Sequence, residues 1–345
     1  MTFKLWPRKL GPRLLGAVLP MFLVFSSARA QGLEEFYRGR TVNLVIPNAP
    51  GGSFDLYGRL VARHIGRFIP GNPNVVAQNM PGAGGMISAN WLYEVAPKDG
   101  AAMAISVPNI ALAHVLEVGP IRYDARKFGW VGRIVSPTAT LFTWHTSPSK
   151  TITDLRERET MIASTGPLSQ AQITSQMMNG VADAKFKLIT GYKGTTDAIL
   201  ALEQGEVEAA IMPWTFLKAT RPDWIRDKKI NVVAQYTRMP NPDLPGVPSI
   251  FELARTEEQR EIFKLFFGPD EIGQSLMLPP GVSADKLEMM RKAFTAMAAD
   301  KEFVADADKQ KLELSTAPWQ DVQSSIEEAY KATRAQIAVA KKYYE

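Results

Sequence analysis

Three short segments join glycine to hydroxyl side chains where a helix is expected to begin. They are PGGSFD at 50–55, STGPLS at 164–169 and GYKGTT at 191–196. The first backbone N–H groups of a helix have no partner within it, and its dipole is positive there, so such turns attract anions. One such turn is more often an ordinary helix cap. Three of them indicate a site that could hold a carboxylate from two sides.

Asp55, in the first of these turns, has two candidate roles. It could accept a hydrogen bond from a ligand ammonium or a bound water. It also stands in the first turn of an expected helix, where a carboxylate is favoured, four residues before Arg59. We favour the structural role and keep Asp55 among the site candidates. The segment Gly82-Ala83-Gly84-Gly85 lacks the spacing of a dinucleotide or P-loop motif, so we interpret it as a tight turn for helix packing.

The sequence lacks the motifs of common enzyme and metal sites. Its 345 residues hold no Cys and three His, at 64, 114 and 145, without a ligand spacing. G-x-S-x-G and H-E-x-x-H are also absent. We therefore find no candidate catalytic residue in these motifs and expect no metal site. An exported α/β hydrolase acting on an anionic substrate stays open as the alternative, because a Ser or Thr of the turns could meet a His in the fold.

Residues 1–30 have the pattern of an export signal. A basic segment precedes the apolar run 14–25, and Ala28-Arg29-Ala30 then precedes Gln31. We expect cleavage after Ala30 and a periplasmic protein. This leader holds five of the 40 basic residues and no acidic one, so 35 basic and 35 acidic residues remain. The net charge of +5 therefore belongs to the leader, and a nucleic-acid partner is not expected.

The candidate turns need elements that hold them in place. Strands are expected at 41–47, 74–78 and 101–106, with helices at 54–69 and up to residue 96, a rhythm typical of an open parallel sheet. Further strands are expected at the positions 131–134, 139–144, 160–164, 186–189, 207–212 and 230–235. Ligands of such sheets lie outside the carboxyl ends of the strands, where these turns fall.

The length and the alternation of elements predict two α/β lobes. The first would comprise 31–136 and 237–345, and the second 137–236. The C-terminal third is expected to be helical, at 249–267, 284–299 and 319–344, and to pack on the first lobe. Hinges are expected near 134–137 and 235–240, where the chain would cross between the lobes.

An ordered series of short motifs is similar to the Bug-type solute receptors, the periplasmic binding proteins of tripartite tricarboxylate transporters. The series covers nearly all of the chain after residue 30. It comprises FYxGxT at 36–41, PGGxxDxxxR at 50–59, NxPGAGG at 79–85, APKDG at 96–100, GYKG at 191–194, GEVE at 205–208, VPSxxEL at 247–253 and LPPGV at 278–282.

This resemblance implies a two-lobed periplasmic-binding-protein fold, type II-like, in which each lobe is a mostly parallel sheet flanked by helices and a cleft lies between the lobes. It also implies a carboxylate ligand, membrane permease subunits as partners, no catalysis and no cofactor. We expect a monomer. A sensing role, with the same pocket read by a signalling protein, stays open.

The resemblance assigns ligand contacts to the same turns and to residues after the third strand. In the first lobe the implied residues are Gly51, Gly52, Ser53, Asp55, Ser106 and Asn109. In the second lobe they are Ser164, Thr165, Gly166, Ser169, Tyr192, Gly194 and Thr195. Phe54 departs from the small residue common at its position. Together with Trp214, it predicts room for an apolar or aromatic group on the ligand.

Overall fold

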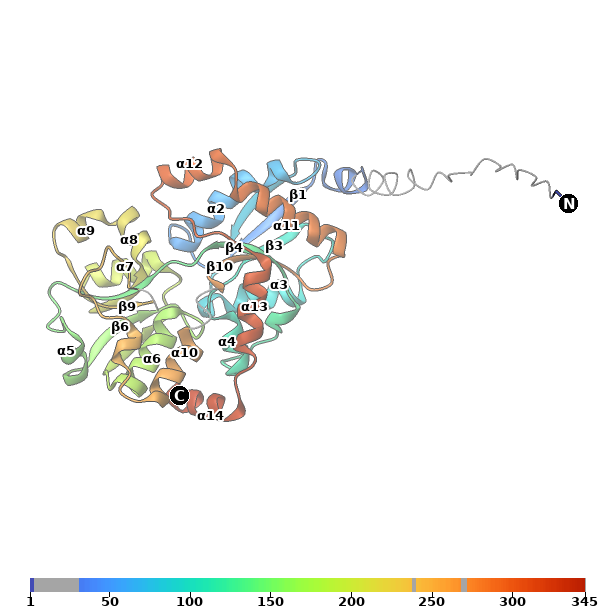
Figure 1. Ribbon diagram of the computed structural model, residues 1–345. Coiled ribbons are helices and arrows are strands. Elements are labelled where there is room, and N and C mark those ends of the chain that lie inside the picture. Colours follow the sequence, from blue (N-terminus) through green and yellow to red (C-terminus); the bar gives the residue numbers. More distant parts are fainter. Residues whose placement is uncertain (3–30, 238–239, 268–271, 345) are drawn as a thin grey trace.

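The computed structural model describes residues 1–2, 31–237, 240–267 and 272–344. Two β-sheets, each flanked by helices, lie side by side in this part of the chain (Figure 1). The first has six strands in the order β11-β4-β10-β3-β1-β2, and the second has five in the order β7-β6-β8-β5-β9. We call each sheet with its helices a lobe. The expected leader and its cleavage after Ala30 lie, apart from residues 1–2, outside the described residues.

The first lobe is built from two separate stretches of chain. Its strands are β1 (Thr41–Ile46), β2 (Asn74–Asn79), β3 (Ala102–Ile105), β4 (Gly129–Val135), β10 (Gln274–Leu278) and β11 (Ala317–Pro318). Its helices are α2 (Ser53–Ile65), α3 (Met86–Glu94), α4 (Ile110–Val115), α11 (Ala284–Ala298), α12 (Lys301–Lys309) and α13 (Trp319–Ala329), with short 3-10 turns at 66–68, 83–85 and 125–127.

The second lobe takes its strands from one stretch. They are β5 (Ala139–Trp144), β6 (Thr160–Ser164), β7 (Phe186–Thr190), β8 (Ala209–Pro213) and β9 (Ile230–Tyr236). Its helices are α5 (Ile152–Glu157), α6 (Gln170–Ala182), α7 (Thr195–Glu203), α8 (Trp214–Thr220), α9 (Pro222–Arg226), α10 (Glu257–Phe267) and α14 (Arg334–Tyr344), with a 3-10 turn at Ile250–Leu253.

Both sheets are mixed, which corrects the expectation of mostly parallel ones. β1 pairs in parallel with β2 and β3, and β6 with β7 and β8. β10 instead lies antiparallel between β3 and β4, and β5 lies antiparallel between β8 and β9. The reason is topological. A strand that enters a sheet from the other lobe arrives from the opposite end, whereas a strand after a local helical crossover runs parallel.

The C-terminal helices divide between the lobes. α11 and α13 contact β4, and α12 contacts α2. α10 and α14 contact the second lobe instead, α14 through α6, and Figure 1 shows α14 beside α10 below the second sheet. The chain therefore crosses between the sheets after β4, between β9 and β10, and again after α13. The expectation that all the last helices pack on the first lobe does not describe α10 and α14.

The apolar core explains this arrangement. One cluster fills the face of the first sheet under α2, α11 and α12, and includes Leu60, Met290 and Phe303. Another lies under α7, α8 and α9 of the second lobe. The largest runs through both lobes, from Trp130 of β4 to Phe263 of α10. Burial of apolar surface thus holds each lobe together and also joins them.

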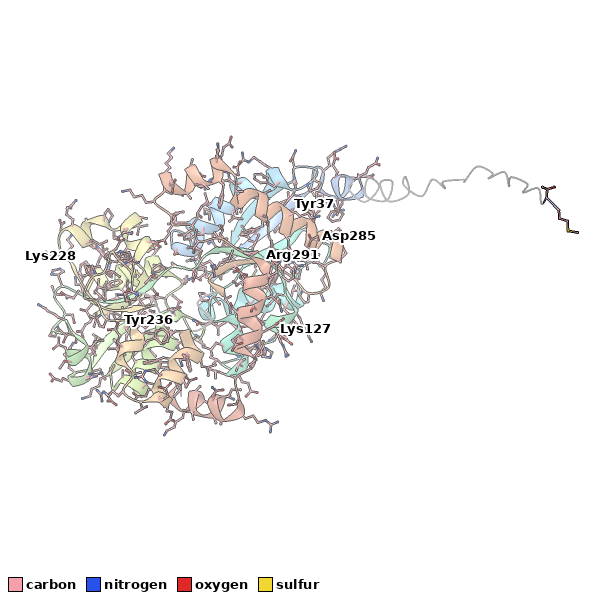
Figure 2. All side chains as sticks on the ribbon, in the orientation of Figure 1. Tyr37, Lys127, Lys228, Tyr236, Asp285 and Arg291 are labelled. Carbon is pink, nitrogen blue, oxygen red and sulfur yellow. The ribbon has the colours of Figure 1, made fainter. Side chains whose placement is uncertain are left out.

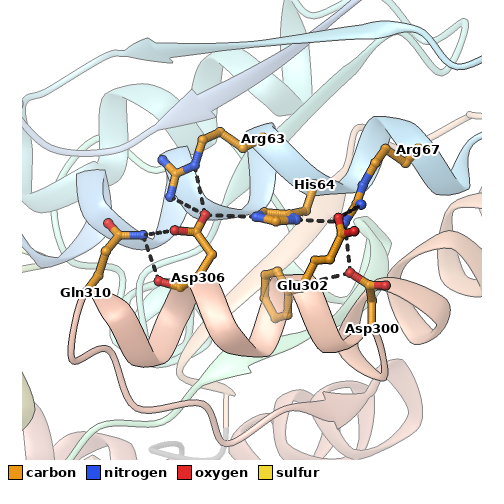
Figure 3. Close-up of polar contacts among 8 residues, drawn as sticks. Arg63, His64, Arg67, Asp300, Glu302, Asp306 and Gln310 are labelled. Atoms are coloured by element: carbon orange, nitrogen blue, oxygen red, sulfur yellow. Dashed lines mark hydrogen bonds and ion pairs between the residues drawn. The ribbon is translucent and has the colours of Figure 1, made fainter.

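A polar cluster on the outside of the first lobe fixes α12 to α2 (Figure 3). Asp306 accepts hydrogen bonds from Arg63 Nη2 at 2.9 Å and from His64 Nε2 at 2.8 Å. Arg67 pairs with Asp300 at 2.8 Å and also with Glu302.

No helix among the described residues is long and apolar enough to cross a membrane.

Candidate functional site

A cavity of about 130 Å³ lies between the two lobes, among the turns that leave the strand ends. The first lobe contributes Asn48, Ser53, Phe54 and Gln274, and the second contributes Thr165, Ser169, Thr195 and Tyr236. The lining also includes Ser136, Pro137 and Gly273, which lie at two of the crossings between the lobes. Much of the remaining lining is apolar, including Val107, Leu168, Ile211 and Met212.

Helix α2 begins at this cavity. Its N-cap, Gly52, has no side chain to cap the helix. The carboxylate of Asp55 turns back and accepts from the Gly51 amide at 2.8 Å, from Arg59 Nε at 3.0 Å and from Asn79 Nδ2 at 2.9 Å. Burial acts to raise the pKa of Asp55, but these hydrogen bonds and the charge of Arg59 outweigh it and hold the pKa below its ordinary value. Asp55 shapes the turn and does not line the cavity.

Helix α7 of the second lobe begins with the same design. Gly194 is its N-cap, again without a side-chain cap. Asp197 accepts from the Lys193 amide at 3.0 Å, as Asp55 accepts from that of Gly51. A glycine N-cap leaves the first amides of the helix without a side-chain acceptor, so both turns offer backbone donors to a ligand.

A third helix, α6, also starts at the cavity. Ser169 is its N-cap and accepts from the Gln172 amide at 3.1 Å. Ser164 Oγ lies 3.0 Å from Ser169 Oγ and accepts from the Gly166 amide at 3.1 Å. The first residues of α2, α6 and α7 (Ser53, Gln170 and Thr195) all line the cavity. Three positive dipole ends therefore meet around one space, and none of its lining side chains in the described ranges is charged.

The two lobes meet directly around the cavity. The Ala49 amide donates to Lys193 O at 3.2 Å, and Thr196 Oγ1 donates to Pro50 O at 3.2 Å. On another side, the Gly84 amide donates to Thr165 O at 2.9 Å and Asn109 Nδ2 donates to Leu168 O at 3.4 Å. These contacts join loops of the two lobes directly around the cavity.

Glycine is required where the loops approach most closely. A Cβ added at Gly84 would lie 2.4 Å from the Ser169 amide nitrogen, and one at Gly166 would lie 2.8 Å from backbone atoms of Ala83. The turn at 82–85 is predicted from the sequence to be a tight turn for helix packing. It is in addition a contact surface for the other lobe.

Three residues of the cavity lining each have a buried polar atom without a hydrogen-bond partner among the described residues: Asn48 Oδ1, Gln274 Oε1 and the Tyr236 hydroxyl. Gln274 uses its Nε2 to donate to Ser53 Oγ at 3.0 Å. Tyr236 lies in the interior of the second lobe (Figure 2), and burial raises its pKa well above the ordinary value, so its hydroxyl stays protonated.

The structure brings five of the predicted site residues to the cavity lining: Ser53, Phe54, Thr165, Ser169 and Thr195. Six further predicted residues shape the turns behind this lining. They are Asp55, Ser164 and the four glycines Gly51, Gly52, Gly166 and Gly194. Gly52 faces Thr195 of the other lobe, whose Oγ1 would be 3.1 Å from an added Cβ.

The other four predicted residues do not line the cavity. Ser106 accepts from the Ser275 amide at 3.1 Å and so ties β10 to the end of β3, while Asn109 bridges the lobes. Tyr192 donates to Glu206 at 3.4 Å, and Trp214 is buried in the core of the second lobe.

Sequence reasoning did not single out Asn48, Tyr236 and Gln274. Asn48 lies two residues before the first glycine turn, and this proximity is a signal that could have included it. Tyr236 and Gln274 end and begin strands on either side of a crossing between the lobes. The only trace of Gln274 in the sequence is a polar pair, Gln274-Ser275, ahead of the apolar run 276–278.

The described residues hold no cluster of acidic and His side chains that could bind a metal ion. His64 pairs with Asp306 on the outside of the first lobe, and His114 Nδ1 lies 2.5 Å from the Tyr330 hydroxyl. Neither of these, nor His145, lines the cavity. The nucleophile–base pair that the hydrolase alternative needs is thus not formed by the residues lining this site.

The family described as "Tripartite tricarboxylate transporter family receptor" matches residues 61–339. Protein BugT of Bordetella pertussis is 28% identical over 261 residues, with 71% of this chain and 75% of BugT covered. A UPF0065 protein from the tcbD-tcbE intergenic region of Pseudomonas sp. strain P51 is 27% identical over 251 residues, with 71% of this chain and 72% of that protein covered.

Solved structures of similar fold are also two-lobed. The periplasmic binding protein BugD superposes with a TM-score of 0.69 at 22% identity, covering 89% of this chain and 98% of BugD. MatC of Rhodopseudomonas palustris with bound malate superposes with a TM-score of 0.69 at 19% identity, covering 89% of this chain and 99% of MatC. An R. palustris protein with adipate has a TM-score of 0.66 at 21% identity, covering 88% of this chain and 96% of that protein. At these identities the likeness concerns the fold.

Proposed function

Because the chain belongs to the receptor family of tripartite tricarboxylate transporters, we propose that its interlobe cavity captures a small carboxylate with an apolar body. A receptor of this family binds its cargo and does not transform it. The observation that carries the proposal is the convergence of α2, α6 and α7 on one enclosed space whose described lining has no charged side chain. Backbone amides and helix dipoles are the groups that hold an anion in such a place.

The apolar lining indicates the rest of the ligand. Phe54 lies beside the start of α2, and Leu168 and Met212 face the same space. Two proteins of similar fold have malate and adipate bound, which supports a small acid as the ligand. Trp214, expected to help hold an apolar group, is buried behind the lining in the core of the second lobe.

The proposal extends to location and partners. The leader at 1–30 supports export and cleavage after Ala30 to the periplasm, where receptors of this family work, and delivery to membrane permease subunits. Intact mass of the exported protein checks the cleavage, with Gln31 expected as the first residue. Light scattering checks the expected monomer.

A thermal-shift screen against a carboxylate panel tests binding. A ligand at a hundredfold excess over its Kd raises the free energy of unfolding by about 2.7 kcal/mol if it binds only the folded state. We expect a shift with at least one acid and no chemical change of that acid. If mass spectrometry of denatured protein finds no retained ligand and no acid gives a shift, the proposed function is wrong.

A charge placed in the lining tests the electrostatic argument. Ala198 of α7 is buried at the cavity. We expect Ala198→Asp to weaken binding of the acid found in the screen about a hundredfold, because like charges brought together cost several kcal/mol. Ala198→Asn has nearly the same shape without the charge and serves as the control. Equal losses in both variants, measured by calorimetric titration, would contradict an anion site.

A further inference from the structure

The segment between α12 and β11, residues 310–316, packs against the first crossing between the lobes, where the chain leaves β4. We call this segment the brace. Its Ser315 makes three hydrogen bonds to the end of β4. The Ser315 amide donates to Ile134 O at 3.3 Å. Its hydroxyl accepts from the Ser136 amide at 2.8 Å, and its carbonyl accepts from Arg133 Nε at 3.1 Å.

The brace is itself fixed to the first lobe. Gln310 Nε2 donates to Asp306 Oδ1 at 3.0 Å, within the polar cluster of Figure 3. Leu312 is buried in the core under α2, α11 and α12. The hydroxyl of Tyr57 in α2 donates to Glu313 O at 2.8 Å. All these contacts belong to one lobe, so the brace moves with that lobe and carries Ser315 with it.

The far end of the same crossing is held by the second lobe. The Trp214 amide donates to Thr138 O at 2.9 Å, and Trp214 is buried in the core of that lobe. Ser136 is thus bonded to one lobe and Thr138 to the other. Pro137 stands between them, without an amide hydrogen and with a fixed φ. At this crossing, a change in the angle between the lobes is therefore left to the few torsions around Pro137.

The crossing is also part of the cavity wall. Ser136 and Pro137 line the cavity, whereas Ser315 does not. β4 lies between β10 and β11 in the sheet. On the β10 side, a Cβ added at Gly273 would overlap Val135 O, so the end of β4 is already packed against backbone there. On the other side, Ser315 decides where this end lies.

We propose that Ser315 is a positioning residue for ligand binding. From outside the cavity, its hydroxyl fixes Ser136 to the first lobe, confines the pivot between the lobes to Pro137, and so sets the place of Pro137 in the cavity wall. Without this hydroxyl the pivot extends back into 134–136, and the lobes sample more relative orientations. Fewer molecules then have the arrangement in which both lobes contact the ligand, and the apparent affinity falls in proportion. This inference rests on the proposed function, since it assumes that a ligand binds between the lobes.

Distances between the lobes and ligand affinity together test the proposal. The chain has no Cys, so a pair of spin labels can be attached without removing native thiols. Val95 of α3 and Leu200 of α7 are exposed and stand in different lobes. We would label the double variant Val95→Cys/Leu200→Cys and measure the label-to-label distance distribution by double electron–electron resonance. Unlabelled protein would be titrated with the carboxylate panel, malate, adipate and 3-phenylpropanoate among its members, and the acid that the parent binds most tightly would be used for every variant.

Ser315→Ala should broaden the distance distribution of the free protein and lower the affinity for that acid about fivefold or more, as expected for one hydrogen bond. Ser325→Ala is the matched control, because the Ser325 hydroxyl is exposed and donates to Asp321 O of its own helix at 3.0 Å. It should match the parent in both measurements. Ser315→Thr keeps the hydroxyl and should restore both the narrow distribution and the affinity.

The outcomes distinguish positioning from a merely structural contact. If Ser315→Ala has the affinity and the distance distribution of the parent, the proposal is wrong, even where the thermal midpoint falls. A threonine variant that behaves like the alanine variant would show that the hydroxyl is not the cause. If the parent binds no acid of the panel, the proposed function fails, whereas the width of the distribution in the free protein still decides whether Ser315 confines the pivot.

Discussion

At the scale of single residues, the two turn aspartates show how the site is prepared without being part of the lining. Asp55 and Asp197 each close a loop onto the amide four residues before it. That bond keeps the loop compact ahead of a glycine N-cap and leaves the following amides turned to the cavity. The favoured structural role of Asp55 agrees with its three hydrogen bonds, and its place among the ligand contacts remains a prediction.

Asp55→Asn should lower the free energy of unfolding by about 1–2 kcal/mol near neutral pH, because one amide oxygen cannot replace a carboxylate with three donors. The pKa of Asp55 lies below its ordinary value when folded. Its stabilisation is therefore complete above the unfolded pKa near 3.8 and is lost as pH falls through the folded pKa. Denaturation at a series of pH values should show the variant and the parent converging below pH 4 or so.

Asp197→Asn is the matched control. Its carboxylate occupies the same place in the α7 turn and accepts from the Lys193 amide and not from an arginine in the described structure. A loss as large as that of Asp55→Asn would show that the arginine and Asn79 contribute nothing.

At the scale of elements, local patterns predicted what is local. The apolar runs that became β1, β5 and β6 were predicted within a residue, because a short apolar run bounded by turn residues is typical of a buried strand. β10 was not expected, since its five buried residues follow a region read as helical and its neighbours in the sheet, β3 and β4, lie far away in sequence. Gln274 was missed with it. The predicted site residues lie at the starts of helices, which can be recognised in the sequence. The missed residues lie at the ends of strands, and these ends come together only because the chain crosses between the lobes.

The loop at 82–85 is the element through which closure can be tested. Gly84→Ala would place a Cβ 2.4 Å from the Ser169 amide nitrogen of the other lobe. We expect the closed form to be disfavoured, with ligand affinity at least about tenfold lower and a larger radius of gyration in X-ray scattering with ligand present.

Gly39→Ala controls for backbone strain. Gly39 has φ +70, close to the +66 of Gly84, yet a Cβ there meets nothing within 4 Å. Both variants place an alanine in the left-handed backbone conformation, which destabilises each of them to a similar extent. Only Gly84→Ala adds a clash between the lobes, so only this variant should change the ligand affinity and the radius of gyration. An equal effect of the two on affinity would argue against a contact that locks the lobes.

At the scale of the whole molecule, α14 ties the end of the chain to the second lobe after α13 has packed on the first. Ala340 of α14 is fully buried, and Lys341 Nζ reaches back to Glu117 of the first lobe at 2.5 Å. The sequence predicted one long helix at 319–344. The helix breaks between α13 and α14 because α13 packs on the first lobe and α14 on the second. The spacing of apolar residues in the sequence does not indicate such a break.

Ala340→Glu should detach α14 or bury an unpaired charge, and either lowers the free energy of unfolding by about 3 kcal/mol. Ala335→Glu makes the same change at an exposed position of the same helix and should have little effect. Thermal unfolding compares the two, and hydrogen exchange should show faster opening of α6 in Ala340→Glu alone. Similar midpoints for both variants would mean that α14 contributes little.

The backbone contacts that close the lobes have a consequence for evolution and for engineering. Ala49 meets Lys193, and Gly84 meets Thr165, through main-chain atoms that stay the same whatever side chains surround the ligand. Movement and recognition are therefore encoded at different positions of the chain. New cargoes can arise by exchanging lining residues such as Met212 without redesigning the motion. For the same reason the protein suits use as a reagentless biosensor, in which the lining chooses the analyte and a dye at exposed Leu200 of α7 reports the closing of the lobes.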